Sequence, residues 1–92
     1  MFELEYSGQF KKDLKLMLKR GADIEDIRII LHMLETDGQV ADSYRPHILS
    51  GKYSGIWECH IKPDWLLLYD ISDSITLIRL VRTGTHSDLF KK

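Results

Sequence analysis

Residues 56–71, IWECHIKPDWLLLYDI, decide the class of fold. Apolar and polar side chains alternate along the first six residues, which is the period of two of a half-buried strand. Pro63 and Asp64 supply the chemistry of a turn, and the nearly continuous apolar run 65–71 is typical of a central strand buried on both faces. We therefore expect a β-hairpin here. The alternation would place Trp57, Cys59 and Ile61 on one side of its first strand and Ile56, Glu58 and His60 on the other.

The preceding residues predict one short strand and two helices. Residues 2–6 alternate in polarity, as a first strand does. Ser7 can cap a helix that follows this strand and ends at Gly21, and a second helix begins at Asp23 and runs to Gly38. Because the two helices are joined by a short connection, we expect them to form a helical hairpin.

The remaining segments predict a sheet of consecutive strands. A brief extended piece at 48–49 and a glycine-containing turn at 50–55 come before the hairpin. A turn at 72–74 and a last strand at 75–82 follow it, and a short segment, HSDLF, occupies residues 86–90. The order of strand, two helices and consecutive strands predicts an α+β domain with the helices packed on a small antiparallel sheet. The first strand must then pair with a later one.

Composition limits the class of protein. The chain has 92 residues, of which 43% are hydrophobic and 29% charged, and this is sufficient for a single packed domain over residues 1–92. The lone cysteine, Cys59, excludes an internal disulfide and a zinc site built from thiolates. No apolar stretch approaches the roughly 18 residues of a membrane span, and Glu3 and Glu5 differ from the basic start of a signal peptide. We therefore expect a cytoplasmic protein that does not bind a membrane.

Charge is unevenly distributed although its sum is near zero. Thirteen Lys and Arg oppose fourteen Asp and Glu, for a net charge of −1 with neutral histidines. Residues 11–20, KKDLKLMLKR, are nonetheless basic, whereas residues 23–42 are acidic apart from Arg28. The basic stretch could form a local RNA-binding surface, or it could simply be a solvated helix face. The lysines concerned are Lys11, Lys12, Lys15 and Lys19.

Three histidines and one aspartate lie at the ends of predicted elements, where a rigid sheet presents reactive groups. They are His47, His60, Asp64 and His86, whereas His32, in the middle of a predicted helix, is expected to be incidental. Imidazole exchanges protons near neutral pH, and RNA cleavage without a metal needs a base for the 2′-hydroxyl, an acid for the leaving 5′-oxygen and a cation near the phosphate. Alternatively, His60, Asp64 and His86 could bind a metal, although their spacing matches no common ligand motif.

Three further residues could assist RNA cleavage. Arg82, near the end of the last predicted strand, could supply the cation. Exposed rings of Trp65 and Phe90 could stack on RNA bases. Each of these residues also has a structural alternative, as a solvated arginine or as an aromatic residue of the core.

Three segments resemble the YafQ family of bacterial type II toxins, within the RelE/ParE superfamily. They are EYSGQFKKDLK at 5–15, RPHILSGKYSGIWECHIKPDWLLLY at 45–69 and RTGTHSDLF at 82–90, and the similarity covers nearly the whole chain. The resemblance implies a RelE/ParE-like fold and a ribosome-dependent endoribonuclease without a cofactor, which cuts translated mRNA and in this family prefers adenine-rich lysine codons. It also implies a DinJ-like ribbon-helix-helix antitoxin, commonly in a heterotetramer through which the pair contacts operator DNA and represses its own operon.

The same motifs imply roles for individual residues. The functional positions of the family correspond to His47, His60, His86 and Asp64, and its aromatic positions to Trp65 and Phe90. We expect His86 to act as the general acid, with Asp64 and His60 sharing the work of the general base and of orienting the 2′-hydroxyl. The alternative is a non-catalytic protein on the same scaffold, either a ParE-like inhibitor of a protein target such as gyrase or a degenerate toxin that acts only as a corepressor.

Overall fold

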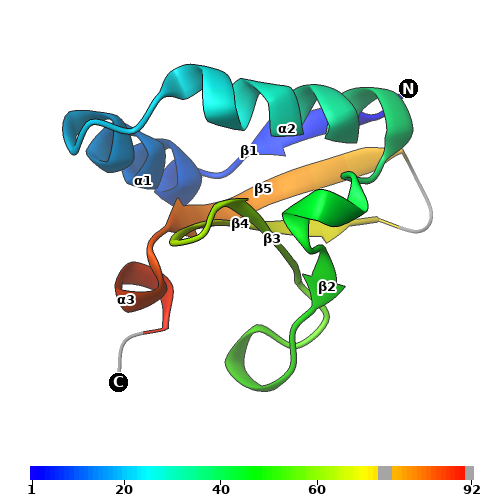
Figure 1. The fold of residues 1–92 in the computed structure, drawn as a ribbon. Helices are drawn as coiled ribbons and strands as arrows, with labels where there is room; N and C mark the ends of the chain where they lie inside the picture. The colour runs from blue at the N-terminus through cyan, green and yellow to red at the C-terminus, as the bar shows by residue number, and fades with distance from the viewer. Residues whose placement is uncertain (73–75, 91–92) are drawn as a thin grey trace.

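The structure, a computed structural model, describes residues 1–72 and 76–90. It contains a five-stranded sheet in the order β1-β5-β4-β3-β2, with two long helices on one face and a short helix on the other (Figure 1). The predicted α+β class is therefore confirmed. The strands are β1 (Glu3–Tyr6), β2 (His47–Ile48), β3 (Trp57–Lys62), β4 (Trp65–Ile71) and β5 (Leu77–Gly84); the helices are α1 (Gly8–Lys19), α2 (Ile24–Asp37) and α3 (His86–Leu89), with 3₁₀ turns η1 (Asp42–Tyr44) and η2 (Gly51–Tyr53).

The two long helices begin and end where the sequence predicts. The Ser7 side chain accepts the N–H of Phe10 at 2.9 Å and caps α1, and the Asp23 side chain caps α2 in the same manner. Gly38 ends α2 with a φ of 73°, and a Cβ atom there would lie 2.4 Å from the ring of Phe2, so a side chain at this position would be both strained and crowded. None of the helices in the described part of the chain is long and apolar enough to cross a membrane.

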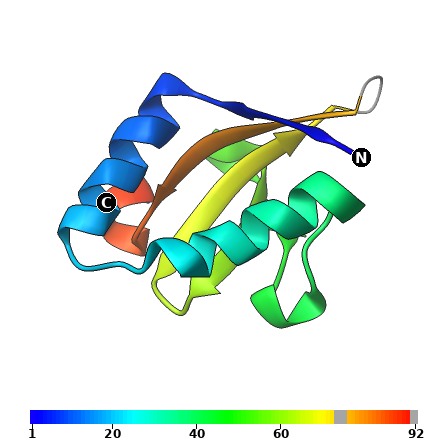
Figure 2. The same ribbon diagram turned by 90° about the horizontal axis from the view of Figure 1, so that it is seen from above.

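β4 lies at the centre of the sheet and is buried on both faces, as predicted. Leu67 and Tyr69 belong to the core that includes side chains of α1 and α2, and both helices lie over this face of the sheet (Figure 2). Leu66 and Leu68 point to the opposite face, where they pack with Leu89 of α3. β3 and β4 pair antiparallel around the turn, as the predicted hairpin requires. The sheet therefore divides the hydrophobic core into two layers.

One detail of the predicted sheet is wrong, because the sheet is not antiparallel throughout. β1 runs parallel to β5, with Glu3 beside Leu77 and Tyr6 beside Leu80, whereas the other strand pairs are antiparallel. Parallel neighbours require a crossover connection, and the chain supplies one because α1 and α2 intervene between β1 and the rest of the sheet. The expectation that the first strand pairs with a later one is confirmed.

The other predicted segments differ from the structure mainly at their ends. The extended piece predicted at 48–49 is β2, shifted by one residue, and the predicted turn at 50–55 contains η2. The last predicted strand, 75–82, is β5, shifted by two residues. Residues 73–75, which include most of the predicted turn and the predicted start of this strand, lie outside the described residues. The segment HSDLF forms the one-turn helix α3, which the sequence did not predict.

Beyond the end of β1, the side chains of the residue that caps α1 and of one in the middle of α1 make hydrogen bonds to the backbone at the edge of β5. The Ser7 hydroxyl donates to the carbonyl of Val81 at 2.9 Å, and the Asp13 carboxylate accepts the N–H of Thr83 at 3.2 Å. The same carboxylate accepts two hydrogen bonds from Arg82, both at 3.0 Å. Side chains thus replace a neighbouring strand along this part of the edge.

Candidate active site

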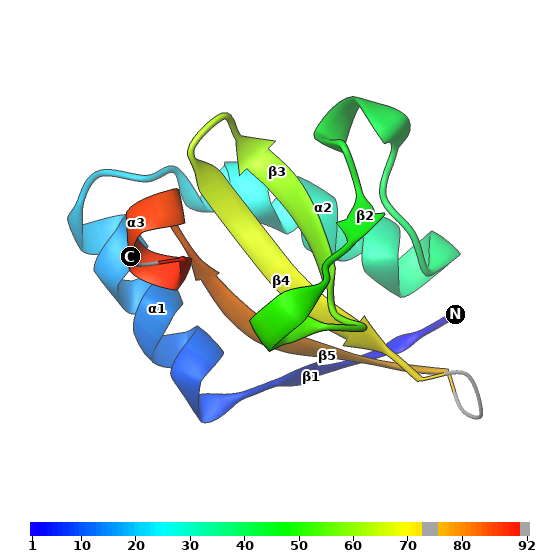
Figure 3. The ribbon, with the colours of Figure 1, turned by 90° about the horizontal axis from the view of Figure 1, so that it is seen from below.

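The face of the sheet opposite the two long helices carries the predicted histidines. β2 pairs with β3 so that His47 lies opposite Glu58, and His60 follows two residues later on the same face of β3. The turn after β3 presents Asp64, and α3, which lies on this face, begins with His86 (Figure 3). The structure therefore brings together four side chains from β2, β3, the following turn and the start of α3, and adds Glu58 to them.

Glu58, to which the sequence analysis gave no role, lies between two of the histidines. Its side chain is only 7% exposed, and its Oε1 atom lies 3.0 Å from Nε2 of His47 and 3.6 Å from Nε2 of His60. A carboxylate with so little access to water needs such partners, because an unpaired buried charge is costly. The other ring nitrogen of His47 lies 3.0 Å from the carbonyl of Arg45, which fixes the orientation of this ring.

Asp64 and His86 form a second carboxylate–imidazole pair, and this pair is open to solvent. One oxygen of Asp64 lies 2.6 Å from Nδ1 of His86 and also accepts the backbone N–H of His86 at 2.9 Å. The side chains are 65% and 54% exposed, respectively. The hydrogen bonds from the backbone and then from the ring of His86 lower the pKa of the Asp64 carboxyl below its ordinary value.

His60 connects the two pairs. The ring centroid of His60 lies 6.3 Å from that of His47 and 5.9 Å from that of His86. Imidazoles and carboxylates therefore alternate in one continuous arrangement across β2, β3, the following turn and α3. We call this arrangement the histidine–carboxylate cluster; it consists of His47, Glu58, His60, His86 and Asp64.

α3 is a single helical turn that is stabilised by a capping box at its start and by an ion pair with Arg20, the residue that follows α1. The Thr85 hydroxyl accepts the N–H of Asp88 at 3.2 Å while the Asp88 carboxylate accepts the N–H of Thr85 at 3.0 Å, which is a capping box. Arg20 donates two hydrogen bonds to the same carboxylate, at 2.7 and 3.3 Å. Arg20 and the Thr85 N–H lower the pKa of Asp88 to about 2, so the ion pair persists at neutral pH. These contacts fix the helix that carries His86.

Arg82 already has a carboxylate partner in this structure. Its guanidinium donates to both oxygens of Asp13, and this ion pair raises the pKa of Arg82 above its ordinary value, with a smaller contribution from the hydroxyl of Tyr53. The guanidinium also helps to hold α1 against β5. The structure thus gives Arg82 a structural role, and its contact with RNA stays a prediction.

The prediction that Trp65 stacks on RNA bases is wrong. Trp65 is 3% exposed in the core beneath the long helices, and its indole N–H donates to the hydroxyl of Thr83 at 2.9 Å. A ring without an accessible face cannot stack on a base. Phe90, in contrast, is half-buried, and its ring meets that of Tyr53 at 5.8 Å between centroids, so its predicted contact with RNA stays a prediction.

The lysines of the basic stretch lie apart from the histidine–carboxylate cluster. All four are exposed on α1, which packs on the other face of the sheet (Figures 2 and 3). Their contact with RNA stays a prediction. These residues are Lys11, Lys12, Lys15 and Lys19.

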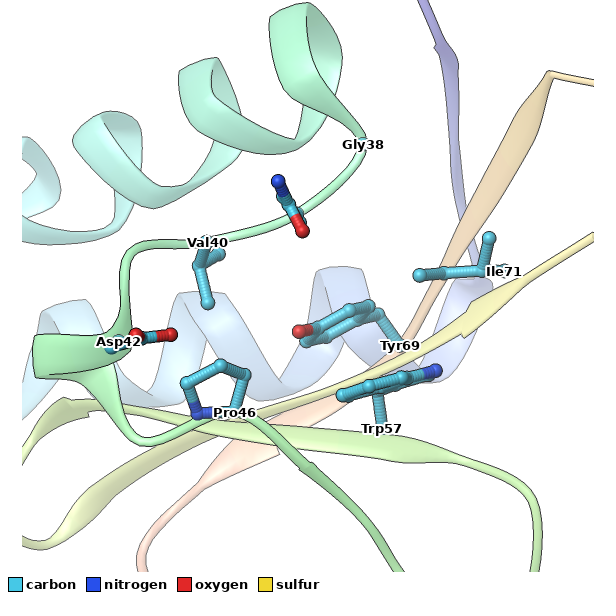
Figure 4. A pocket seen from close by; sticks show the side chains of 8 residues that line it. Gly38, Val40, Asp42, Pro46, Trp57, Tyr69 and Ile71 are labelled. Carbon is cyan, nitrogen blue, oxygen red and sulfur yellow. The ribbon is translucent and has the colours of Figure 1, made fainter.

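A cavity of about 350 Å³ lies beside the C-terminal end of α2, on the face of the sheet that the long helices cover (Figure 4). The rings of Trp57 and Tyr69 stack beside it, with 6.4 Å between their centroids. Its lining is mainly apolar and contains no member of the histidine–carboxylate cluster. The lining residues are Gly38, Gln39, Val40, Asp42, Pro46, Trp57, Tyr69 and Ile71.

The described residues offer no preformed metal site and no reactive thiol. Among residues 1–72 and 76–90, no three His, Cys, Asp or Glu side chains are arranged to hold a metal ion. The alternative in which His60, Asp64 and His86 act as ligands would therefore require these side chains to rearrange. Cys59 is fully buried, and burial raises the pKa of its thiol to about 12, so that it stays protonated.

Comparison with known proteins identifies the class and then the family. Residues 2–91 match a family of bacterial toxins of type II toxin-antitoxin systems. This family is YafQ, and the chain belongs to it. The chain is 38% identical over 89 residues to the mRNA interferase toxin YafQ of Escherichia coli strain K12. The aligned region covers 96% of this chain and 95% of that protein.

Solved structures of relatives have the same fold. A crystal structure of the E. coli DinJ-YafQ complex contains a chain with a TM-score of 0.86 and 37% identity, over 98% of this chain and 99% of that chain. A metal-bound toxin from Helicobacter pylori has a TM-score of 0.87 and 40% identity, over 98% of this chain and 100% of that chain. The chain therefore has the fold of the YafQ toxins, which is an α+β fold as the sequence predicts.

Proposed function

We propose that this chain is a ribosome-dependent mRNA interferase, an endoribonuclease toxin in which a ribose 2′-hydroxyl of translated mRNA attacks the adjacent phosphate. Membership of the YafQ toxin family and the name of its E. coli relative, an mRNA interferase toxin, support this function. The observation that carries the proposal is the histidine–carboxylate cluster. It presents proton donors and acceptors side by side on an accessible face of the sheet, as acid–base catalysis requires.

His86 is the general acid in this mechanism. Its Nδ1 atom is occupied by Asp64, so Nε2 is the nitrogen left to give a proton to the leaving 5′-oxygen. Asp64 orients the imidazole and stabilises its charged form, as the carboxylate does in other carboxylate–imidazole pairs. The lowered pKa of Asp64 makes it a weak base, and we therefore assign it this orienting role instead of a share in proton abstraction.

His60 is the general base. Its ring lies 5.9 Å from that of His86, which allows one phosphate group to contact both residues. The Glu58 carboxylate, 3.6 Å from Nε2 of His60, stabilises the imidazolium that forms when His60 takes the proton of the 2′-hydroxyl. His47, on the other side of the same carboxylate, orients Glu58 and adds positive charge near the phosphate when protonated.

The partners follow from the same family membership. Because the E. coli relative has been crystallised with DinJ, this chain is expected to pair with a DinJ-like ribbon-helix-helix antitoxin, in a heterotetramer, and to reach operator DNA only through that complex. Ribosomes and mRNA are its targets, and the cytoplasm is where it meets them. Co-expression with a neighbouring small open reading frame, followed by purification and sizing of the complex, tests this assignment.

The central experiment compares His86→Ala with His32→Ala, because His32 is an exposed histidine on α2 outside the cluster. Each purified protein is added to ribosomes that translate one defined mRNA, and the new 5′ ends are mapped. We expect the wild type and His32→Ala to cut within codons at the ribosomal A site, and His86→Ala to cut at least about 10²-fold more slowly. Cleavage by His86→Ala at the wild-type rate would contradict the acid assignment. In a parallel experiment the wild type is expressed in cells. Growth arrest there without new mRNA 5′ ends would favour a non-catalytic inhibitor of a protein such as gyrase, or a corepressor.

The proposed mechanism uses no metal at the toxin's own site. A metal-bound structure of an H. pylori relative makes this point worth testing directly. The toxin is treated with a chelator, dialysed, analysed for residual metal and then added to ribosomes in their usual magnesium buffer, which preserves the ribosomes. We expect the metal-free toxin to cleave at the untreated rate. A loss of activity that zinc or copper restores would replace this mechanism with a metal-dependent one.

A further inference from the structure

Two aromatic rings lie next to the histidine–carboxylate cluster, and neither has a role in the mechanism above. Tyr53 ends η2 in the loop between β2 and β3, and Phe90 follows α3. Their ring centroids are 5.8 Å apart and the ring planes make an angle of 89°, so the edge of one ring meets the face of the other. η2 and α3 project from the same face of the sheet (Figure 3). A segment far from α3 in the sequence thus contributes an aromatic residue to the catalytic face.

The aromatic pair lies one helical turn from the proposed general acid. The N–H of Phe90 donates to the carbonyl of His86 at 2.8 Å, so these two residues are at opposite ends of the single turn of α3. Leu89, between them, is 3% exposed and packs with Leu66 and Leu68. α3 therefore has a fixed position on the sheet, and a nucleotide on the aromatic pair would be adjacent to the one whose phosphate contacts His86.

Positive charge accompanies the aromatic pair. The Nζ atom of Lys52 lies 5.5 Å from the centroid of the Tyr53 ring, within the range of a cation–π contact. Lys52 is exposed, and no carboxylate of the described residues lies within ion-pair distance of it. Arg82 approaches the hydroxyl of Tyr53 while its charge is balanced by Asp13. Lys52 is therefore the cation on this loop that is available to a phosphate.

The exposure of the two rings distinguishes them from the aromatic residues of the core. Tyr53 and Phe90 are half-buried, whereas Trp65 and Tyr69 are at most 3% exposed. Most of the loop around Tyr53 is exposed, with the backbone of Gly51 at a φ of 75°. The loop thus holds one aromatic ring against Phe90, the residue after α3, and carries one cation beside that ring.

We infer that Tyr53 and Lys52, together with Phe90, form a nucleotide subsite for single-stranded RNA next to the bond that is cut. The base of the flanking mRNA nucleotide stacks on the aromatic pair, and Lys52 contacts its phosphate. This inference rests on the proposed function, since it places the nucleotide relative to His86. Stacking is tolerant of base identity, so the subsite strengthens the capture of message more than it selects a sequence.

The test measures capture of message separately from chemistry. Single-turnover cleavage is followed on ribosomes programmed with one mRNA while the toxin concentration is varied. For Tyr53→Leu, we expect the half-saturating concentration to rise about 5- to 100-fold with little change in the maximal rate, because base–aromatic contacts have this strength. Tyr53→Phe retains the ring and should stay near the wild-type value.

Tyr6→Leu is the matched control. Tyr6 is an exposed tyrosine that, like Tyr53, is paired with a phenylalanine, Phe10, at 5.9 Å between centroids, but it lies on β1, at the opposite edge of the sheet from β2. It should behave as the wild type. Lys52→Gln, which alters no core contact, should reduce the dependence of log affinity on log salt concentration by about 0.7, as the loss of one phosphate contact on a single strand does.

Each outcome decides the inference. Equal half-saturating concentrations for Tyr53→Leu and Tyr6→Leu would overturn the inference. A fall in the maximal rate of Tyr53→Leu with no change in its half-saturating concentration would also overturn it, because that result would indicate that Tyr53 only packs against α3. If Tyr53→Leu unfolds, an unchanged salt dependence for Lys52→Gln overturns the inference by itself. The slowly cleaving His86→Ala protein allows binding to be measured separately from cleavage, and the binding assay can be used even if the wild type cuts no mRNA. Weaker binding of His86→Ala/Tyr53→Leu to ribosomes with mRNA, but not to empty ribosomes, supports the subsite, whereas equal weakening on both overturns it.

Discussion

The side-chain oxygen of Asp64 that lies 2.6 Å from Nδ1 of His86 also accepts the backbone N–H of His86 at 2.9 Å. One carboxylate oxygen therefore fixes both the ring and the backbone of the residue that opens α3. The contact therefore also joins the turn after β3 to the start of α3, two of the segments that carry the histidine–carboxylate cluster. In other carboxylate–imidazole pairs, this arrangement directs the second ring nitrogen toward the substrate.

The Asp64 carboxyl is expected to titrate below its ordinary value of 3.8, because the backbone and ring of His86 lower its pKa. A carboxyl whose pKa is lower in the folded state stabilises that state above its unfolded pKa, and the contribution disappears as pH falls through the lowered value. NMR of the carboxyl carbons should show this low midpoint. In His86→Ala, where the backbone contact remains and the ring contact is lost, the midpoint should rise part of the way toward 3.8. An unchanged midpoint would exclude a contribution from the ring.

Replacing Glu58 with glutamine should slow cleavage while the protein stays folded. The amide has nearly the same size and can still accept a hydrogen bond, but it lacks the charge that stabilises an imidazolium at His60 or His47. We expect single-turnover cleavage to fall about 10- to 100-fold with the affinity for ribosomes unchanged. Glu35→Gln, at an exposed position of α2, is the control. Full activity of Glu58→Gln would show that the buried charge does not take part.

Breaking the ion pair between Arg20 and Asp88 should reduce the rate more than the stability. Arg20→Met removes both hydrogen bonds to Asp88, so α3 is held less firmly and His86 is positioned less accurately, and we expect a rate loss of about tenfold. Arg20→Lys, which keeps the charge but not the two-pronged geometry, should lie between Arg20→Met and the wild type. Thermal unfolding and single-turnover cleavage are measured together.

A matched control exists for this ion pair. Arg79→Met removes another exposed arginine–carboxylate pair, with Glu5, which joins β5 to β1. Equal rates for Arg79→Met and Arg20→Met would contradict a positioning role for Arg20. Because the pKa of Asp88 is lowered to about 2, the pair is intact above the ordinary carboxyl range, and its contribution should be lost only as pH falls through about 2.

Trp65→Phe should destabilise the protein without changing the chemistry of the folded fraction. The substitution removes the hydrogen bond to Thr83 and part of the core volume, which together should lower the free energy of unfolding by about 1–3 kcal/mol. Urea unfolding measures this loss. The half-saturating concentration for mRNA should stay at the wild-type value, and an increase in it would indicate that the indole does contact RNA.

The sequence was sufficient to predict most of the fold, because its local patterns are strong. The apolar run 65–71 has the composition of a strand with two buried faces, and Ser7, Asp23 and Gly38 are residues whose side chain or backbone freedom marks a helix end. The parallel direction of β1 could not be predicted, since it depends on where α1 and α2 return the chain relative to the sheet. α3 escaped prediction because four residues are too few to display a helical period.

The candidate site was only partly predictable for a different reason. Histidines at the ends of helices and strands can be selected as candidates from their residue type alone. The burial of a side chain, in contrast, depends on residues that are distant in the sequence. The role of Glu58 could not be predicted, because a glutamate on the polar side of an alternating strand is ordinarily solvated, and its contact with His47 depends on the pairing of β2 with β3. The burial of Trp65 could not be predicted either, because the sequence does not show that Thr83, on β5, accepts the indole N–H of Trp65 inside the core.

The parallel pairing of β1 with β5 has a consequence for the order of events during synthesis. Contacts such as that of Ser7 with Val81 join residues 74 positions apart, and pairing between segments so distant must await the emergence of the later one. The nascent polypeptide therefore cannot complete its sheet until β5 has left the exit tunnel. Until β5 has emerged, β1 has no partner strand, and the histidine–carboxylate cluster on the opposite face of the sheet is incomplete because α3 follows β5.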